Sequence, residues 1–234
     1  MYMGGKSRVS KQIAEFLRSV RVDGQTYVEP FVGGASVLVN MNGERMASDL
    51  CKPLISLYES VQNGWVPPEA VSKETWEQYK ENREIDDPMT AFCGFGCSFG
   101  GAYFSSYVPV GAKNHAKITS RWLNKHRENL STVDFSCCSY LDLNPENCLV
   151  YCDPPYKGTR RYIAVEKFDS GLFWKTMNKW SMNNTVVVSE FSAPDGWEAV
   201  KEFESRQTIQ HAKRGDITTK EKLFMCKKAR NCNT

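Results

Sequence analysis

The run Asp153-Pro154-Pro155-Tyr156 carries the side chains with the most specific chemistry in this 234-residue sequence. Asp153 follows the apolar run 149–152, which predicts an Asp at the carboxyl end of a buried strand, where open α/β sheets bind ligands. The two prolines restrict the backbone and lack amide hydrogens, so the turn is stiff and its carbonyl groups remain acceptors. A carboxylate, a carbonyl and the flat ring of Tyr156 together favour binding of a nucleobase amine. The alternative is a proline-rich turn that carries an exposed tyrosine.

A glycine turn is the second candidate site. The stretch 26–31 predicts a short strand that runs into Val32-Gly33-Gly34-Ala35-Ser36. Two glycines alone suit many α/β proteins, and the Gly-x-Gly-x-x-Gly spacing of nicotinamide-dependent oxidoreductases is absent at Gly33, which disfavours that class. Asp49 lies about one βα unit beyond the turn, where a carboxylate can accept hydrogen bonds from both hydroxyls of a ribose. Capping of the helix that follows is the alternative role for Asp49.

The segments that position these residues alternate between strand and helix, which predicts an α/β fold with a parallel sheet. Between Asn63 and Leu130 the alternation of strand and helix is interrupted. This stretch contains two consecutive prolines, an acidic helical segment and a run of glycines and aromatics. We therefore expect an inserted segment of different architecture there, with the sheet completed after it. Apolar periodicity predicts helices over 10–20, 37–41, 54–61 and 168–180, and strands over 26–31, 45–48, 133–140, 149–153, 185–190, 203–210 and 223–227.

Charge is separated along the chain, although the net charge is only +3. Residues 69–87 are mainly acidic, whereas 113–128 and 213–230 are mainly basic, which fits either a solvated surface or phosphate contacts. Nine cysteines without paired spacing indicate neither a zinc site nor a disulfide framework, and we expect no metal. No apolar stretch is long enough to span a membrane, and the N-terminus lacks the apolar core of a signal peptide. We therefore expect a cytoplasmic protein that does not contact a membrane.

Four segments, in this order, resemble the Dam-type (D12 class) DNA adenine-N6 methyltransferases of bacteria and their phages. They are Tyr2-Met3-Gly4-Gly5-Lys6, the run Glu29-Pro30-Phe31-Val32-Gly33-Gly34-Ala35-Ser36, Asp49, and Asp153-Pro154-Pro155-Tyr156. The resemblance implies a Rossmann-like class I S-adenosylmethionine-dependent methyltransferase sheet with an inserted, mainly helical target-recognition domain. It divides the chain into a first catalytic part (1–55), a target-recognition region (56–130) and the remainder of the catalytic domain (131–234). It also implies a protein of a bacterial cell, or of the bacterial host of a phage.

The same resemblance implies S-adenosyl-L-methionine as methyl donor, S-adenosyl-L-homocysteine as product, and direct transfer without a metal. Lys6 is expected to neutralise the carboxylate of the donor, and Asp142 to meet the amine of its adenine. An exposed loop position is the alternative for Asp142. The expected catalytic residues are Asp153, Pro154, Pro155 and Tyr156. The expected cofactor contacts are Tyr2, Lys6, Phe31, Gly33, Gly34, Asp49, Asp142 and Asp153.

Double-stranded DNA is the expected partner, and the base must leave the duplex before its amine can react. The segment 98–107 differs from the arginine-rich hairpin of relatives that target GATC and is similar to shorter phage relatives, so the recognition sequence stays open. The alternatives are methylation of the cytosine N4 amine and a non-catalytic DNA-binding protein of the same fold. We expect a monomer or a weak dimer. The expected DNA contacts are Tyr103, Tyr107, Lys113, Asn114, Arg121, Lys157, Arg160 and Arg161.

Overall fold

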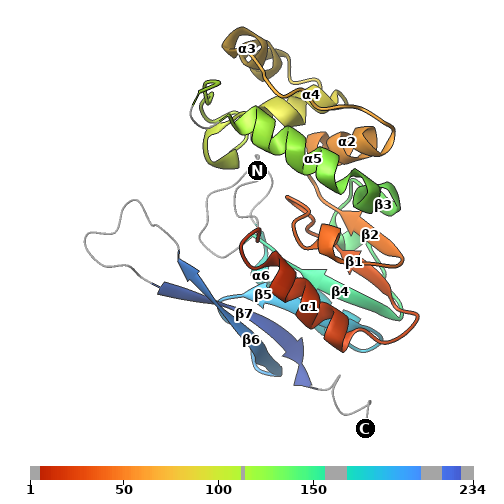
Figure 1. Cartoon of the computed structure of the whole chain (residues 1–234). Helices are drawn as coiled ribbons and strands as arrows, with labels where there is room; N and C mark the ends of the chain where they lie inside the picture. The colour runs from red at the N-terminus through yellow and green to blue at the C-terminus, as the bar shows by residue number, and fades with distance from the viewer. Residues whose placement is uncertain (1–5, 112–113, 156–167, 207–217, 228–234) are drawn as a thin grey trace.

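A seven-stranded mixed sheet forms the centre of the computed structural model, which describes residues 6–111, 114–155, 168–206 and 218–227 (Figure 1). The strand order is β3-β2-β1-β4-β5-β7-β6. Strands β1 to β5 pair in parallel, and β7 pairs antiparallel with both β5 and β6, so the β6–β7 hairpin completes the sheet at one edge. The strands are β1 (Thr26–Glu29), β2 (Arg45–Ser48), β3 (Val133–Ser136), β4 (Cys148–Cys152), β5 (Thr185–Glu190), β6 (Trp197–Arg206) and β7 (Thr218–Cys226).

Helices cover both faces of the sheet, because alternate residues of a strand point to opposite sides. Helices α1 and α2 share a core with Leu149 and Tyr151 of β4, and α6 packs on the opposite face against Val150 and Cys152. Strand β4 is buried along its whole length, as expected of a central parallel strand. The helices are α1 (Ser10–Val20), α2 (Lys52–Gln62), α3 (Lys73–Asn82), α4 (Pro88–Ala91), α5 (His115–Ser131) and α6 (Ser170–Trp180). The short turns are η1 (Leu38–Asn40), η2 (Phe92–Gly96), η3 (Phe99–Gly101) and η4 (Tyr140–Asp142).

A group of helices lies between β2 and β3 in the chain and stands beyond one end of the sheet (Figure 1). It comprises α3, α4 and α5 with the turns η2 and η3, and it contains no named strand within its described residues. The indole of Trp76 in α3 holds the group together by donating hydrogen bonds of 3.1 Å to the Cys93 carbonyl and to Ser98 Oγ. The predicted α/β fold, with a Rossmann-like methyltransferase sheet and a mainly helical insertion, is confirmed. The division at 56–130 stays a prediction, and its first boundary falls within α2.

The segment after the glycine turn differs from the predicted helix over 37–41. The chain forms only the single 3₁₀ turn η1, and Met41 is already extended. Strand β2 starts at Arg45, so the chain must reverse within a few residues, which it does through Gly43 with a φ of +75°. The chain between the glycine turn and β2 is therefore too short for a helix and forms a single turn. Strands β6 and β7 also begin earlier than predicted, because the ladder between them stabilises polar residues that no apolar pattern identifies.

The cysteines serve mainly as core residues. Six of the described cysteines are buried, and none of the described ones forms a disulfide. Within the same residues, no cluster of three or more His, Cys, Asp or Glu side chains has the arrangement of a metal site. A separate finding for the described part of the chain is that its helices are too short or too polar to cross a membrane.

Candidate active site

Asp153 and Pro154 stand at the carboxyl end of the central strand β4. Pro154 is buried and Pro155 is exposed, and Tyr156 lies outside the described residues. The side chain of Asp153 is 19% exposed, and its Oδ1 lies 2.8 Å from Nζ of Lys6. The structure therefore brings together two predicted site residues that lie 147 positions apart in the sequence.

Lys6 is buried between two carboxylates. Its Nζ lies 2.7 Å from Oε1 of Glu221 in β7, in addition to its contact with Asp153. The same Glu221 oxygen accepts a hydrogen bond of 2.6 Å from Oγ of Ser189 in β5. Burial by itself lowers the pKa of Lys6, but the two carboxylates outweigh burial and raise it. Lys6 is therefore a charged ammonium that contacts the site's own acids.

Glu29 is a second buried carboxyl group near Asp153. It ends β1, the strand next to β4, and the hydroxyl of Tyr27 donates a hydrogen bond of 2.7 Å to its Oε2. Burial, together with the negative charge of Asp153, raises the pKa of Glu29 to about 8, although the Tyr27 hydrogen bond opposes the shift. At neutral pH Glu29 is therefore mainly protonated and adds no second negative charge beside Asp153.

The glycine turn follows β1 and is tied to Asp49 at the end of β2. Gly33 has a φ of +44°, in the left-handed region where a side chain is unfavourable. Its amide donates a hydrogen bond of 2.9 Å to Asp49 Oδ2, and the Cys51 amide donates one of 2.9 Å to Oδ1. The hydroxyl of Tyr58 donates to the Gly33 carbonyl at 2.7 Å. Asp49 thus holds both the turn and the start of α2, and burial raises its pKa.

An aromatic cluster lies beside the turn, on the face covered by α6. The ring of Phe31 is 5.2 Å from that of Tyr140 and 5.9 Å from that of Phe173, measured between centroids. Tyr140 begins the turn η4, in which Oδ2 of the exposed Asp142 accepts a hydrogen bond of 3.1 Å from the Ser139 amide. The structure therefore gives Asp142 a capping role and places it next to these aromatic rings.

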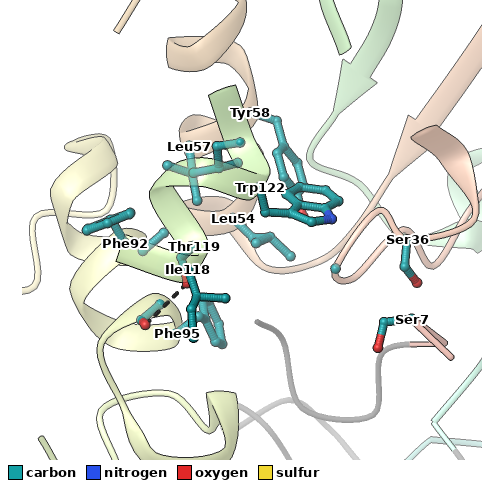
Figure 2. A pocket seen from close by; sticks show the side chains of 14 residues that line it. Ser7, Ser36, Leu54, Leu57, Tyr58, Phe92, Phe95, Ile118, Thr119 and Trp122 are labelled. Carbon is teal, nitrogen blue, oxygen red and sulfur yellow. Dashed lines mark hydrogen bonds between the residues drawn. The ribbon is translucent and has the colours of Figure 1, made fainter. Parts of the chain in front are cut away.

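A cavity of about 140 Å³ lies between the glycine turn and the helical insertion (Figure 2). Gly34, Ser36 and Ser7 form one side of it. The opposite side is mainly apolar and comes from α2, η2 and α5, with Tyr58 and Trp122 among the lining residues. Since Ser7 follows Lys6 directly, the cavity opens beside the residue that contacts Asp153.

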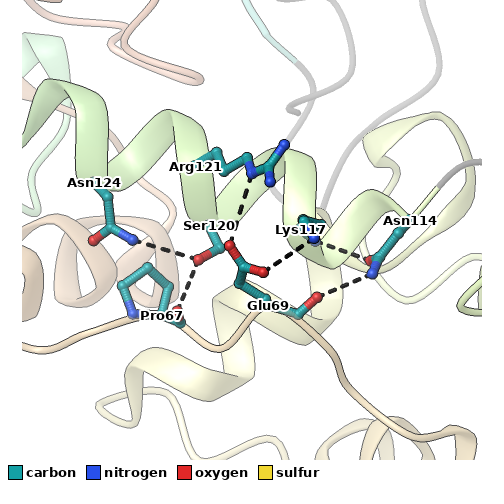
Figure 3. A network of polar contacts seen from close by, with 7 residues as sticks. All are labelled: Pro67, Glu69, Asn114, Lys117, Ser120, Arg121 and Asn124. Carbon is teal, nitrogen blue, oxygen red and sulfur yellow. Dashed lines mark hydrogen bonds and ion pairs between the residues drawn. The ribbon is translucent and has the colours of Figure 1, made fainter.

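Two of the expected DNA contacts form part of a polar network on α5 (Figure 3). Asn114 caps this helix, because its Oδ1 accepts a hydrogen bond of 2.9 Å from the Lys117 amide, and its Nδ2 donates to the Glu69 carbonyl at 3.1 Å. The carboxylate of Glu69 lies 3.3 Å from Lys117 Nζ and 3.7 Å from Arg121 Nε. Arg121 is 68% exposed, so its guanidinium remains accessible to solvent. The basic stretch is therefore partly neutralised within the insertion.

The two expected tyrosine contacts pack within the insertion. The hydroxyl of Tyr107 donates a hydrogen bond of 2.6 Å to the Val71 carbonyl. The ring of Tyr103 stacks near Phe95 with 4.7 Å between centroids, and a Cβ atom added at Gly94 would lie 2.5 Å from it. Both tyrosines thus shape the insertion, and their DNA contacts stay predictions. The other predicted site residues outside the described part are Tyr2, Lys113, Lys157, Arg160 and Arg161.

The sequence did not identify Glu29, Glu221, Ser189 or Tyr140 as site residues. Glu29 directly follows Tyr27 and Val28 in its strand, and a charged residue in that setting was the available signal. Glu221 stands between two lysines in a polar stretch of β7, so its sequence neighbours gave no such signal. Ser189 and Tyr140 have no unusual neighbours in the sequence. Only the fold brings these two residues to this edge of the sheet.

Comparisons with known proteins point to one family. The model of the D12 class N6 adenine-specific DNA methyltransferase family matches residues 2–88 and 98–192. The chain is 27% identical over 179 residues to the DNA adenine methylase of Vibrio cholerae and 28% identical over 185 residues to that of Escherichia coli. Each of these alignments covers 66% of this chain and 63% of the relative, so the chain spans less than two thirds of the length of these relatives.

Solved structures of methyltransferases are also similar in outline. The rRNA methyltransferase AviRa of Streptomyces viridochromogenes is 13% identical with a TM-score of 0.46, and the comparison covers 100% of this chain and 90% of that one. The family match carries the assignment, because it extends over most of the chain and includes the glycine turn, Asp49 and Asp153. The chain belongs to the D12 class N6 adenine-specific DNA methyltransferase family.

Proposed function

We propose that this protein transfers a methyl group from S-adenosylmethionine to the exocyclic N6 amine of an adenine extruded from double-stranded DNA. The observation that carries the proposal is the position of Asp153 and Pro154. They stand at the carboxyl end of the central strand, beside the glycine turn, in a chain of the D12 family. A ligand bound at this edge of the sheet meets a carboxylate and a carbonyl together.

The residues at this edge fit S-adenosylmethionine by their chemistry. Phe31 and Tyr140 offer aromatic surfaces for an adenine ring, and the carboxylate of Asp49 at the end of β2 can accept hydrogen bonds from ribose hydroxyls. The left-handed φ of Gly33 leaves the backbone open to close approach. When bound, the donor supplies a methyl group on a positively charged sulfur, which is a good leaving group.

Asp153 and the Pro154 carbonyl orient the target amine. Both are acceptors, and an amine with two hydrogens can donate to both, which directs its nitrogen lone pair away from the turn. Tyr156 provides the stacking surface for the extruded base. Lys6 fixes the Asp153 carboxylate, and the protonated Glu29 avoids repulsion between neighbouring acids. The protein thus contributes placement and electrostatics, and the donor contributes the reactivity.

The helical insertion faces the DNA in this proposal. Extrusion of a base costs a few kcal/mol, which stacking and phosphate contacts must offset. Arg121 and Lys117 supply exposed positive charge on α5, and the apolar cavity beside Ser7 offers space between the insertion and the catalytic sheet. Lys113, Lys157, Arg160 and Arg161 are the further candidates for phosphate contacts. A monomer or a weak dimer acting in the cytoplasm completes the proposal.

A transfer assay tests the proposal. Purified protein is incubated with plasmid DNA and S-adenosylmethionine labelled in the methyl group. The DNA is then digested to nucleosides, which are separated and identified by mass spectrometry. We expect the label in N6-methyladenine. Label in N4-methylcytosine would show that the methylated base is cytosine and not adenine. No label in any DNA nucleoside would refute the proposal.

Replacement of Asp153 tests its assigned role. Asp153→Ala should lower the rate of transfer at least about 100-fold, because it removes one of the two acceptors that orient the amine. The matched control is Asp134→Ala, which removes an exposed carboxylate from β3 of the same sheet and should keep the wild-type rate. Circular dichroism and thermal unfolding report whether the fold is retained. Full activity in Asp153→Ala would contradict the role of this residue.

A further inference from the structure

Glu221 is a buried acid from the C-terminal hairpin that reaches the site. Its side chain is 9% exposed, and its Oε1 lies 2.7 Å from the ammonium of Lys6, whose side chain is 6% exposed. Ser189 is fully buried and donates a hydrogen bond of 2.6 Å to the same oxygen. Removing a carboxylate from water costs several kcal/mol unless its partners stabilise the charge. Lys6 and Ser189 stabilise the charge of Glu221 in this way, and Lys6 links Glu221 to Asp153.

The ammonium of Lys6 bridges Glu221 and Asp153. Nζ lies 2.8 Å from Oδ1 of Asp153 and 2.7 Å from Oε1 of Glu221. A lysine has a flexible four-carbon stem, so one ion pair does not determine its position, whereas two short contacts on different strands do. Glu221 itself is anchored by Ser189 on the neighbouring strand β5. The hairpin therefore determines where Lys6 meets Asp153.

Glu221 also affects the strength of Asp153 as a hydrogen-bond acceptor. With Asp153 as its sole acid partner, a buried ammonium would draw electron density from the carboxylate that must accept the amine's hydrogen. A second carboxylate shares the positive charge, and Asp153 then remains a stronger acceptor. We infer that Glu221 is a positioning residue for methyl transfer, which holds Lys6 so that Asp153 keeps its place and its strength as a hydrogen-bond acceptor. The inference rests on the proposed function and adds a residue to it.

Glu221→Gln tests the inference, because glutamine keeps the shape and an acceptor for Ser189 but removes the charge. We expect kcat for plasmid methylation, measured at saturating DNA and donor, to fall roughly 10- to 100-fold, since small displacements of a reacting group have effects of this size. The dissociation constant of S-adenosylmethionine, measured by calorimetry, should change less than about threefold. Such a split between rate and binding separates positioning of Asp153 from a loss of the donor site.

Two further variants make the result decisive. Ser189→Ala removes the anchor of Glu221 and should lower kcat about three- to tenfold, and the double variant should be no slower than Glu221→Gln, because both act through one carboxylate. The control Glu202→Gln breaks the exposed pair with Lys222 on the same hairpin and should keep the wild-type rate. The inference fails if Glu221→Gln keeps its rate, or if donor affinity and thermal stability fall as much as kcat does. Absence of methylation by the unchanged protein would instead refute the proposed function as well.

Discussion

At the scale of single residues, the site concentrates acids at the edge of the sheet where the parallel strands β1 and β4 end. Asp153, Glu29 and Glu221 come from β4, β1 and β7, and only one lysine, Lys6, contacts them among the described residues. Such a cluster is tolerated because Glu29 keeps its proton and Lys6 is shared.

The protonation of Glu29 makes stability depend on pH. The folded state keeps this proton up to a pKa of about 8, whereas the unfolded chain loses it near the ordinary value of 4.5. Between these values the unfolded state binds fewer protons, so the free energy of unfolding falls as pH rises. Glu29→Gln keeps the neutral form at every pH and should gain stability relative to wild type, on the order of 3 kcal/mol between pH 5 and pH 8. Urea unfolding at both pH values measures this gain, and an equal difference at the two would contradict it.

At the scale of elements, the insertion is built around α5 and its N-terminal cap. Helix α5 runs over 17 residues from His115, and Asn114 satisfies one of the free amides of its first turn. The same side chain was predicted from the sequence to contact DNA, and the cap already uses its oxygen. The two roles make different demands on the side chain, since a cap needs only an acceptor and base recognition also needs the amide donors.

Substitutions at Asn114 separate these roles. Asn114→Ala should lower the free energy of unfolding by about 1 kcal/mol, because the cap is lost, and Asn114→Ser should restore most of it. If capping is the only role, Asn114→Ser also keeps the wild-type affinity for DNA. Denaturant unfolding and fluorescence anisotropy with a labelled duplex give the two quantities. Unchanged stability in Asn114→Ala would contradict the capping role.

At the scale of the whole molecule, an acidic side chain of the insertion partly neutralises the positive charge of α5. Glu69 lies within 3.7 Å of both Lys117 and Arg121, and all three side chains are at least 40% exposed (Figure 3). Exposed pairs of this kind contribute little to stability, so their main effect is on the electrostatic potential of this face, which the proposed DNA substrate would meet.

Glu69→Gln removes this compensation. The affinity for duplex DNA should rise about three- to tenfold at low salt, and its logarithmic dependence on salt should become steeper by roughly one unit, because more positive charge is available to phosphates. Glu77→Gln on α3 breaks the similar exposed pair with Lys73 and serves as the matched control. Anisotropy titrations at several salt concentrations measure both changes. Equal behaviour of the two variants would show that α5 does not face the DNA.

Local patterns predicted much of the fold. Local patterns placed α1, β2 and β5 with the bounds that the structure has, because α1 buries one helical face and the apolar residues of β5 form a continuous buried run. They failed at η1, where chain length between strands decides, and at β6 and β7, where the polar residues of a ladder carry no apolar signal. The order in which β7 enters between β5 and β6 is also a property of pairing between distant segments.

The site divides in the same way. The sequence by itself identified Asp153 after a buried strand, the glycine turn and Asp49 as candidate site residues, because their chemistry lies in the order of neighbouring residues. Only the tertiary structure decided that Lys6 contacts Glu221 and Asp153, and that Glu29 is dehydrated beside them. The physical reason is that hydration and charge pairing depend on which groups meet in space, and these groups come from opposite ends of the chain.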